Sequence, residues 1–396
     1  MLLKIVSDAN VPFVEEAMSP FGTLELVPGH EITSSRLIDA DALIVRSVTS
    51  VDESLLTGSS VRFVGSATAG FDHIDREYLK RADIAWAHAP GCNAESVVEW
   101  VLAALFHLSQ LHDTPILAST LGIVGCGEIG SRLERRAAAL GMRVLVNDPP
   151  RARKASTKEE QKKFVPLKML LEESDIVSLH VPLKVDGIDA TWNLIGDSEL
   201  ARMKKGVWVL NSSRGGVINE AALVHSIETG QVGAAAVDVW EGEPNPDRQL
   251  EALVDICSPH IAGYSRNAKR SCTETIAKRA AIYFSIPRPE IVHEKLVPKL
   301  LNLPKINPSK SPEAFIHSIV QQMYRIDEDV DRMRSRSDQD GQARETAFRQ
   351  QRWAYPPRYT FSQFQLPSKG VTEEWQSRLS GGLKIEIVDP KVSSQE

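Results

Sequence analysis

A cluster of three glycines near the middle of the chain is the feature that most restricts its fold. Gly125, Gly127 and Gly130 fit the pattern G-x-G-x-x-G, after an apolar run typical of a β-strand and before a stretch typical of a helix. An acidic residue, Asp148, follows at the end of the next predicted strand. This arrangement indicates a turn that binds a dinucleotide pyrophosphate at a helix N-terminus. The same glycines could also mark a methyl-donor nucleotide site or a purely structural turn.

The acidic residue predicts which dinucleotide is bound. The carboxylate of Asp148 would accept hydrogen bonds from the adenosine ribose and repel a 2′-phosphate, which favours NAD over NADP. Arg151 and Arg153 lie close by and would weaken that preference. The motif therefore predicts cofactor contacts at Gly125, Gly127, Glu128, Ile129, Gly130 and Asp148.

Short β-branched runs recur about every 20 residues on both sides of this motif, a spacing that leaves room for the crossovers between parallel strands. Several runs, such as residues 207–210, are apolar on both faces, as in a sheet that is covered on both sides. We predict an α/β protein with two doubly wound parallel sheets, one Rossmann-like and one flavodoxin-like, rather than one (β/α)8 barrel. A long apolar helix near residues 93–111 is predicted to lie between the two bodies.

The length of 396 residues predicts two or three domains. We assign residues 1–92, completed by 264–286, to a substrate-binding domain and residues 93–263 to a NAD-binding domain. Prolines crowd residues 287–312, and a helix with an apolar stripe follows. We expect residues 287–396 to form a small C-terminal α+β domain. Its apolar stripe could serve self-association or dock on the chain's own core.

Charge and cysteine content exclude several classes of function. With 46 basic and 52 acidic side chains the net charge is −6, so a chain-wide basic surface for nucleic acid or anionic lipid is not expected. Four scattered cysteines do not predict a disulfide framework, and without a Cys/His cluster of zinc spacing we predict no metal site. The longest apolar stretch is too short to span a bilayer, and the N-terminus lacks a signal-peptide pattern. We expect a cytoplasmic protein.

Three residues beyond the glycine motif form a candidate catalytic set. Arg214 directly follows a predicted strand, where its guanidinium could fork onto a carboxylate. Oxidation of a secondary alcohol needs a base that works near neutral pH, which suits His260. Glu243 beside it would fix the imidazole tautomer and favour the imidazolium. Taken singly, each residue is more often a salt bridge, a cap or a core residue, but their order after a dinucleotide motif favours the catalytic interpretation.

The order of these motifs resembles the D-isomer-specific 2-hydroxyacid dehydrogenases over roughly residues 1–285. In that family the corresponding Arg, Glu and His are catalytic, which implies the same roles for Arg214, Glu243 and His260. Further stretches resemble the branch that oxidises 4-phospho-D-erythronate with NAD on a route to pyridoxal phosphate. The resemblance implies an oxidoreductase that acts on a small phosphorylated 2-hydroxy acid and forms a homodimer through its C-terminal domain. The stretches that carry it are residues 45–49, 67–70, 89–94, 148–151, 238–244 and 260–264.

The same resemblance implies further ligand contacts. It places Ser47, Thr68 and Tyr264 on the substrate. The residue pattern agrees in part, because Thr68 and Gly70 follow a strand and could form an anion-binding turn for the carboxylate. Arg46 could hold the phosphate or be a solvated strand end. The resemblance also places four residues on the cofactor, namely Asp148, Val181, Asp238 and Gly263.

Two alternatives remain open at this point. The first is another enzyme of the same family, acting on 3-phosphoglycerate, glyoxylate or lactate analogues. The second is an NADH-sensing binding protein that keeps the fold and the three residues without turning over this substrate.

Overall fold

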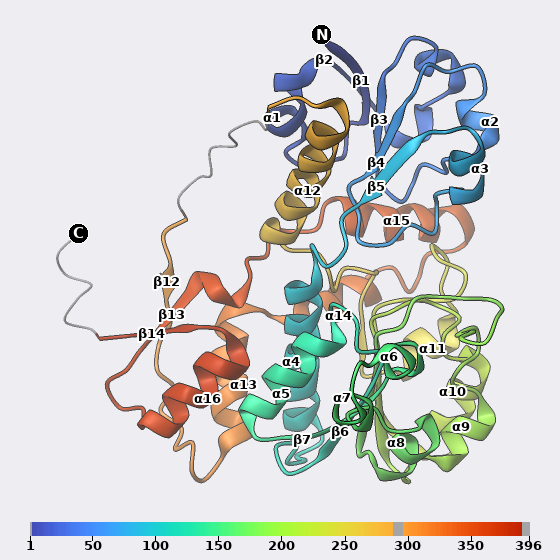
Figure 1. Cartoon of the computed structure of the whole chain (residues 1–396). Coiled ribbons are helices and arrows are strands. Elements are labelled where there is room, and N and C mark those ends of the chain that lie inside the picture. Colours follow the sequence, from blue (N-terminus) through green and yellow to red (C-terminus); the bar gives the residue numbers. More distant parts are fainter. Residues whose placement is uncertain (1, 288–295, 390–396) are drawn as a thin grey trace. The chain divides into compact units, whose positions relative to one another are not determined.

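The computed structural model describes residues 2–287 and 296–389 and divides the chain into two compact units. The first unit comprises Met1–Glu95 and Ser265–Leu296, and the second comprises Ser96–Tyr264 and Val297–Glu396. Each unit is therefore built from two stretches that are far apart in the sequence. Figure 1 shows the chain coloured from its N-terminus to its C-terminus.

The first unit is an α/β body around a five-stranded parallel sheet (Figure 1). The strand order, β2-β1-β3-β4-β5, is that of flavodoxin-like folds, so the prediction for this part of the chain is confirmed. The strands are β1 (Leu3–Asp8), β2 (Gly22–Val27), β3 (Ala42–Val45), β4 (Phe63–Ser66) and β5 (Ala85–His88). The helices are α1 (Val14–Met18), α2 (Glu53–Leu56), α3 (Arg76–Arg81) and α12 (Arg266–Phe284), with 3-10 turns at Ser19–Phe21, Gly29–Glu31 and Ser34–Leu37.

Helices cover both faces of this sheet, which explains its continuous apolar runs. Successive side chains of a strand point to opposite faces. Ile5 and Ile44 belong to a cluster that includes Ile276 of α12. Val6 and Val45 belong to a second cluster, formed with side chains of α2 and α3. Strands buried on both sides need apolar residues at consecutive positions rather than at alternate ones.

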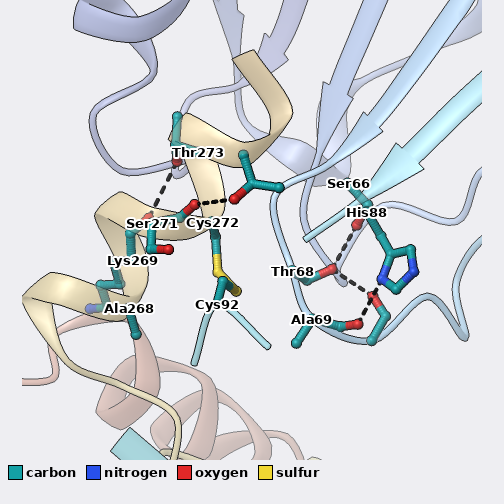
Figure 2. The surroundings of a disulfide bond; sticks show 12 residues. Ser66, Thr68, Ala69, His88, Cys92, Ala268, Lys269, Ser271, Cys272 and Thr273 are labelled. Atoms are coloured by element: carbon teal, nitrogen blue, oxygen red, sulfur yellow. Dashed lines mark hydrogen bonds between the residues drawn. A yellow bond between two sulfur atoms is a disulfide. The ribbon is translucent and has the colours of Figure 1, made fainter. Parts of the chain in front are cut away.

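A disulfide joins the two stretches of chain that make up the first unit. Cys92, just before the end of the N-terminal stretch, is bonded to Cys272 in α12 (Figure 2). The sequence prediction of no disulfide framework did not anticipate this single pair. Its partners are 180 residues apart, and nothing in their local sequence indicates that the fold brings them together.

The second unit contains a six-stranded parallel sheet in the order β11-β10-β9-β8-β6-β7. An isolated parallel bridge between Val146 of β7 and Phe164 adds a rudimentary strand beyond that edge. With this bridge the order contains the 3-2-1-4-5-6 arrangement of the Rossmann fold, and β11 is a seventh strand beside β10, so the predicted Rossmann-like sheet is confirmed. The strands are β6 (Thr120–Val124), β7 (Arg143–Asn147), β8 (Ile176–Leu179), β9 (Val207–Asn211), β10 (Val232–Val237) and β11 (Ile256–Cys257). The helices are α4 (Ala94–Leu111), α5 (Gly130–Leu140), α6 (Pro149–Lys154), α7 (Lys158–Lys162), α8 (Leu167–Glu173), α9 (Asp197–Arg202), α10 (Glu220–Glu228) and α11 (Arg248–Leu253).

The C-terminal segment, residues 297–389, packs within this second unit. Its apolar side chains belong to the same hydrophobic core as those of the Rossmann sheet. The guanidinium of Arg136 in α5 donates hydrogen bonds to the carbonyl oxygens of Gly382 (2.7 Å) and Leu383 (3.0 Å), which ties the end of α16 to the helix that follows the glycine motif. The segment contains β12 (Lys299–Leu300), α13 (Pro312–Met323), α14 (Ile326–Arg334), α15 (Gly341–Trp353), the 3-10 turn Phe361–Gln363, β13 (Phe364–Pro367), α16 (Glu373–Leu383) and β14 (Glu386–Val388).

The long apolar helix predicted near residues 93–111 is α4, and its burial has a clear origin in the second unit. Trp100 donates from its indole Nε1 to Ser258 Oγ after β11, at 3.2 Å. Glu99 accepts a hydrogen bond from the backbone N–H of Phe361 in the C-terminal segment, at 2.7 Å. The helix thus contacts both the sheet and the C-terminal segment, so it is apolar over a wide arc. Across the described residues, no helix is long and apolar enough to cross a membrane.

Candidate active site

The glycine motif forms the turn between β6 and α5. Gly125 has a φ of 93°, in the left-handed region that favours glycine, and a Cβ at Gly130 would overlap the carbonyl oxygen of Gly125. A Cβ at Gly127, in contrast, would have no atom within 4 Å. The first and third glycines are therefore needed for packing within the protein, whereas the second leaves open space beside the N-terminus of α5. This space fits the pyrophosphate of a dinucleotide.

Asp148 is held beside this turn by two backbone groups. One carboxylate oxygen accepts the N–H of Cys126 at 2.8 Å, and the other accepts the N–H of Arg151 at 3.0 Å, where Asp148 caps α6. The carboxylate therefore lies against the glycine turn, where the ribose of an adenosine is expected. Arg153, whose charge would attract a 2′-phosphate, is paired with Asp189 at 2.6 Å. This pairing favours NAD over NADP.

Three other predicted cofactor residues lie in the same turn region. A Cβ built on Gly125 would approach the side chain of Val181, so Val181 lies against the first glycine. Glu128 forms an ion pair with Arg132 at 2.6 Å on the surface of α5. Ile129, between the last two glycines, packs against the core of the unit.

His260 and Glu243 form a direct pair at the carboxyl end of the sheet. Nδ1 of His260 lies 2.8 Å from Oε2 and 3.1 Å from Oε1 of Glu243, which leaves Nε2 as the ring atom that can exchange a proton with a substrate. Burial alone would raise the pKa of Glu243, but the charge and hydrogen bond of His260, followed by the charge of Arg352, bring this pKa below its ordinary value. Glu243 is therefore a carboxylate at neutral pH, and its two oxygens hold the Nδ1 side of the imidazole ring.

Asp238 holds the loop that carries the histidine. This side chain is 1% exposed. One carboxylate oxygen accepts hydrogen bonds from Ser258 Oγ (2.6 Å) and the N–H of Ile261 (2.7 Å), and the other accepts the N–H of Ala262 (3.0 Å). Burial raises the pKa of Asp238. The carboxylate of Asp238 thus fixes the backbone directly after His260 and the side chain of Ser258 before it.

Arg214 lies in a tight loop after β9, the strand next to β10. Its Nη1 donates to the carbonyl oxygen of Ser213 at 2.7 Å, and its own carbonyl oxygen accepts from Asn211 Nδ2 at 3.1 Å. A Cβ on Gly215 would overlap the backbone of Trp240, so this glycine lets the Arg214 loop approach the loop that leads to Glu243. Arg214, Glu243 and His260, the three predicted catalytic residues, therefore follow β9, β10 and β11 respectively. All three lie at the same end of one sheet.

The remaining predicted substrate residues, apart from Tyr264, lie in the first unit at the ends of β3 and β4. Arg46 directly follows β3 and donates from Nη1 to the carbonyl oxygen of Asn10 at 3.1 Å. Ser47 follows Arg46 in the chain. Thr68 Oγ1 lies 2.6 Å from Ser66 Oγ and donates to the carbonyl oxygen of Gly70 at 2.8 Å (Figure 2). These bonds order the turn that was predicted to bind an anion.

Sequence reasoning missed one charged residue of this site. Arg352 in α15 lies with Nη1 4.0 Å from Glu243 Oε2, and its Nη2 donates to the hydroxyl of Tyr264 at 3.4 Å. Because Arg352 is not at a strand end or in a chemical motif, only the packing of the C-terminal segment places it beside Glu243. No group of three or more His, Cys, Asp or Glu side chains in the described part of the chain could hold a metal ion.

Comparison with known proteins identifies the family. The family model for the D-isomer specific 2-hydroxyacid dehydrogenase, NAD binding domain, matches residues 98–262. An erythronate-4-phosphate dehydrogenase from Azotobacter vinelandii is 40% identical over 356 residues, which are 90% of this chain and 92% of the relative. The chain belongs to the erythronate-4-phosphate dehydrogenases. Another member, from Salinibacter ruber, is 50% identical over 274 residues, 69% of this chain and 70% of the relative.

Solved structures support the same fold. A D-lactate dehydrogenase from Aquifex aeolicus, complexed with NAD and lactic acid, has a TM-score of 0.60 at 25% identity, covering 71% of this chain and 96% of that chain. A NAD+-bound 3-phosphoglycerate dehydrogenase from Entamoeba histolytica has a TM-score of 0.61 at 23% identity, covering 74% of this chain and 99% of that chain. Membership of this family confirms that the chain is an NAD-dependent 2-hydroxyacid dehydrogenase. It does not favour the two alternatives, another enzyme of the wider family or an NADH-sensing binding protein.

Proposed function

We propose that this enzyme oxidises 4-phospho-D-erythronate at C2 to the corresponding 2-oxo acid, with reduction of NAD, as a step towards pyridoxal phosphate. The observation that carries the proposal is the pair of His260 and Glu243, 2.8 Å apart, in a sheet whose glycine turn leaves space for a dinucleotide. A base held by a carboxylate at the end of such a sheet fits the oxidation of an alcohol.

Each catalytic residue has a separate task in this reaction. Nε2 of His260 takes the proton of the C2 hydroxyl, while the hydrogen on C2 leaves as hydride. When bound, NAD supplies the acceptor for that hydride. Glu243 compensates the positive charge that develops on the imidazole. Arg214 binds the substrate carboxylate in a forked geometry and polarises the C2 oxygen. The acid–base contribution should be of order 10²- to 10⁴-fold in rate.

The proposed ligand contacts follow the geometry at the strand ends. The ordered turn of Thr68 and Gly70 offers backbone N–H groups to the substrate carboxylate, and Arg46 with Ser47 offers donors to its anionic groups. Tyr264 follows the His260 loop and offers a hydroxyl. For the cofactor we propose the glycine turn of residues 125–130, together with Asp148, Val181, Asp238 and Gly263.

We further propose a homodimer that forms through residues 287–396. In the described part of this segment, Leu300 and Trp353 have large apolar side chains that are more than half exposed, and such groups favour association. Sedimentation equilibrium that gives the mass of one chain at micromolar concentration would contradict this proposal.

The cytoplasm is the proposed location, because NAD and phosphorylated metabolites are found there. Disulfides persist mainly in oxidising compartments, so the bond between Cys92 and Cys272 provides a test. Rapid alkylation of thiols in intact cells should show this pair largely reduced. A fully oxidised pair in growing cells would argue for an oxidising compartment.

The experiment that tests the proposed reaction is a comparison of substrates. Initial rates of NADH formation would be measured with 4-phospho-D-erythronate, D-3-phosphoglycerate and D-lactate at equal concentrations. We expect the highest kcat/KM for 4-phospho-D-erythronate. A higher value for D-3-phosphoglycerate or D-lactate would assign the chain to another reaction of the wider dehydrogenase family.

A further inference from the structure

Arg352, a cation supplied by the C-terminal segment, differs from the fully buried arginines of the second unit in the groups that it contacts. Arg344 and Arg336 both pair with the buried carboxylate of Glu251, and Arg358 donates to backbone carbonyl oxygens, including that of Ala262 at 2.6 Å. Those side chains are committed to the protein's own structure. Arg352 instead lies beside a carboxylate that is already paired with the catalytic histidine.

The hydrogen-bonding capacity of Arg352 is poorly used. A guanidinium has five N–H donors in a planar fork, yet Nη2 makes only a long bond of 3.4 Å to Tyr264, and Nη1 lies 4.0 Å from Glu243. Nε is buried and has no hydrogen-bond partner among the described residues. Burying a charged group with weak partners costs free energy, so an additional anionic partner would stabilise this arrangement.

The guanidinium is also fixed in position. It lies over the ring of Tyr264, 5.9 Å from the centroid, and near the ring of Phe348, at 6.0 Å. The side chain is 23% exposed, so part of it remains accessible to a ligand. A planar, rigid and accessible fork beside a tyrosine hydroxyl matches the oxygens of a phosphoryl group.

We propose that Arg352 and Tyr264 bind the phosphoryl group of the substrate, so that the C-terminal segment determines the selectivity for a phosphorylated 2-hydroxy acid. This inference rests on the proposed function. Arg214 serves the carboxylate next to C2, and a short substrate with a second anionic group needs a second cation near the same histidine. Tyr264 lies four positions after His260 in the same loop, and Arg352 reaches that loop from α15.

The test compares 4-phospho-D-erythronate with unphosphorylated D-erythronate for Arg352→Gln. We expect kcat/KM for the phosphorylated substrate to fall roughly 10- to 100-fold more than kcat/KM for D-erythronate, as for the loss of a charge-assisted hydrogen bond; a loss shared by the two substrates reports the effect of Arg352 on Glu243. Arg352→Lys should keep part of the preference. Arg349→Gln is the matched control, because Arg349 lies on the same helix, is 62% exposed and pairs with Glu345. This variant should keep the wild-type kcat/KM for both substrates.

Equal losses for both substrates would mean that Arg352 acts through Glu243, which would overturn the proposal. If the wild-type enzyme oxidises neither substrate, the proposed reaction fails, and the anion site is decided separately by titration of inorganic phosphate into the NADH complex. Weaker phosphate binding in Arg352→Gln than in wild type would then support the site. Equal phosphate affinity of the two proteins would refute it.

Discussion

Replacement of Glu243 by glutamine removes the charge beside His260, the proposed catalytic base, and keeps a similar shape. In the wild type, two carboxylate oxygens lie 2.8 and 3.1 Å from Nδ1 of His260. With charge centres about 4 Å apart and an effective dielectric constant of about 20, the attraction to an imidazolium is about 4 kcal/mol. Only part of that charge has developed in the transition state, and the side chains are 33% and 20% exposed. We therefore expect a loss of about 1.5–3 kcal/mol in transition-state stabilisation.

That loss corresponds to roughly a 10- to 150-fold lower kcat/KM, measured as the initial rate of NADH formation from 4-phospho-D-erythronate. The affinity for NADH should change little, because Glu243 is bonded to His260 and to the N–H of Trp240 and is not a proposed cofactor contact. Glu241→Gln is the matched control, since Glu241 is an exposed carboxylate two positions away, and it should retain wild-type kinetics. Wild-type kcat/KM in Glu243→Gln would refute the electrostatic role of this carboxylate.

Four further predictions concern the histidine, the glycine turn, a buried carboxylate and the disulfide. His260→Asn should bind NADH normally and lose turnover by 10²- to 10⁴-fold, and unchanged turnover would contradict its role as the base. Gly127→Val should fold as the wild type does, because a Cβ there has no atom within 4 Å, but its Kd for NADH by fluorescence should rise more than tenfold, about 1.4 kcal/mol. Burial raises the pKa of Glu220 to about 7, so its carboxyl is protonated more readily in the folded than in the unfolded state, and stability should fall as pH rises from about 4.5 to about 7. In denaturant unfolding, Glu220→Gln should therefore have the free energy of unfolding of the wild type at about pH 4. At about pH 8 it should be more stable by about 1–2 kcal/mol, after allowance for solvent screening. A gain in stability only at low pH would contradict the raised pKa of Glu220. Cys92→Ser should lower the free energy of unfolding by about 2–4 kcal/mol, and wild type and variant should unfold alike once a reductant is added.

The strands, and the positions of the three proposed catalytic residues at the strand ends, could be predicted from local sequence because their signals are local. A strand covered on both faces is a continuous apolar run, and residues that directly follow such runs meet at one edge of a parallel sheet. Arg214, Glu243 and His260 were found in this way, without knowledge of any contact between them.

The residues that were missed depend on contacts between distant parts of the chain. Arg352 is one of many arginines in helices, and only the packing of α15 brings it to Glu243. The pairing of Cys92 with Cys272 likewise depends on α12 returning to the first sheet. The role of Asp238 in holding the His260 loop was also beyond prediction, because a strand-end aspartate gives no sign of which backbone groups it will accept.

The discontinuity of the first unit has a consequence for biosynthesis. The strands β1–β5 are complete by residue 88, and α1 covers part of one sheet face, but the part of that face that packs against Ile276 and Ala280 of α12 stays uncovered until the whole intervening segment has been translated. At 5–20 residues per second, the 180 residues between Cys92 and Cys272 take roughly 9–36 s. During that time the nascent chain exposes part of an apolar sheet face and the unpaired thiol of Cys92 to the solvent around the ribosome. A chaperone that acts on nascent chains should therefore bind this enzyme between these two points of its synthesis, and a circular permutant that begins at α12 should need less of such help.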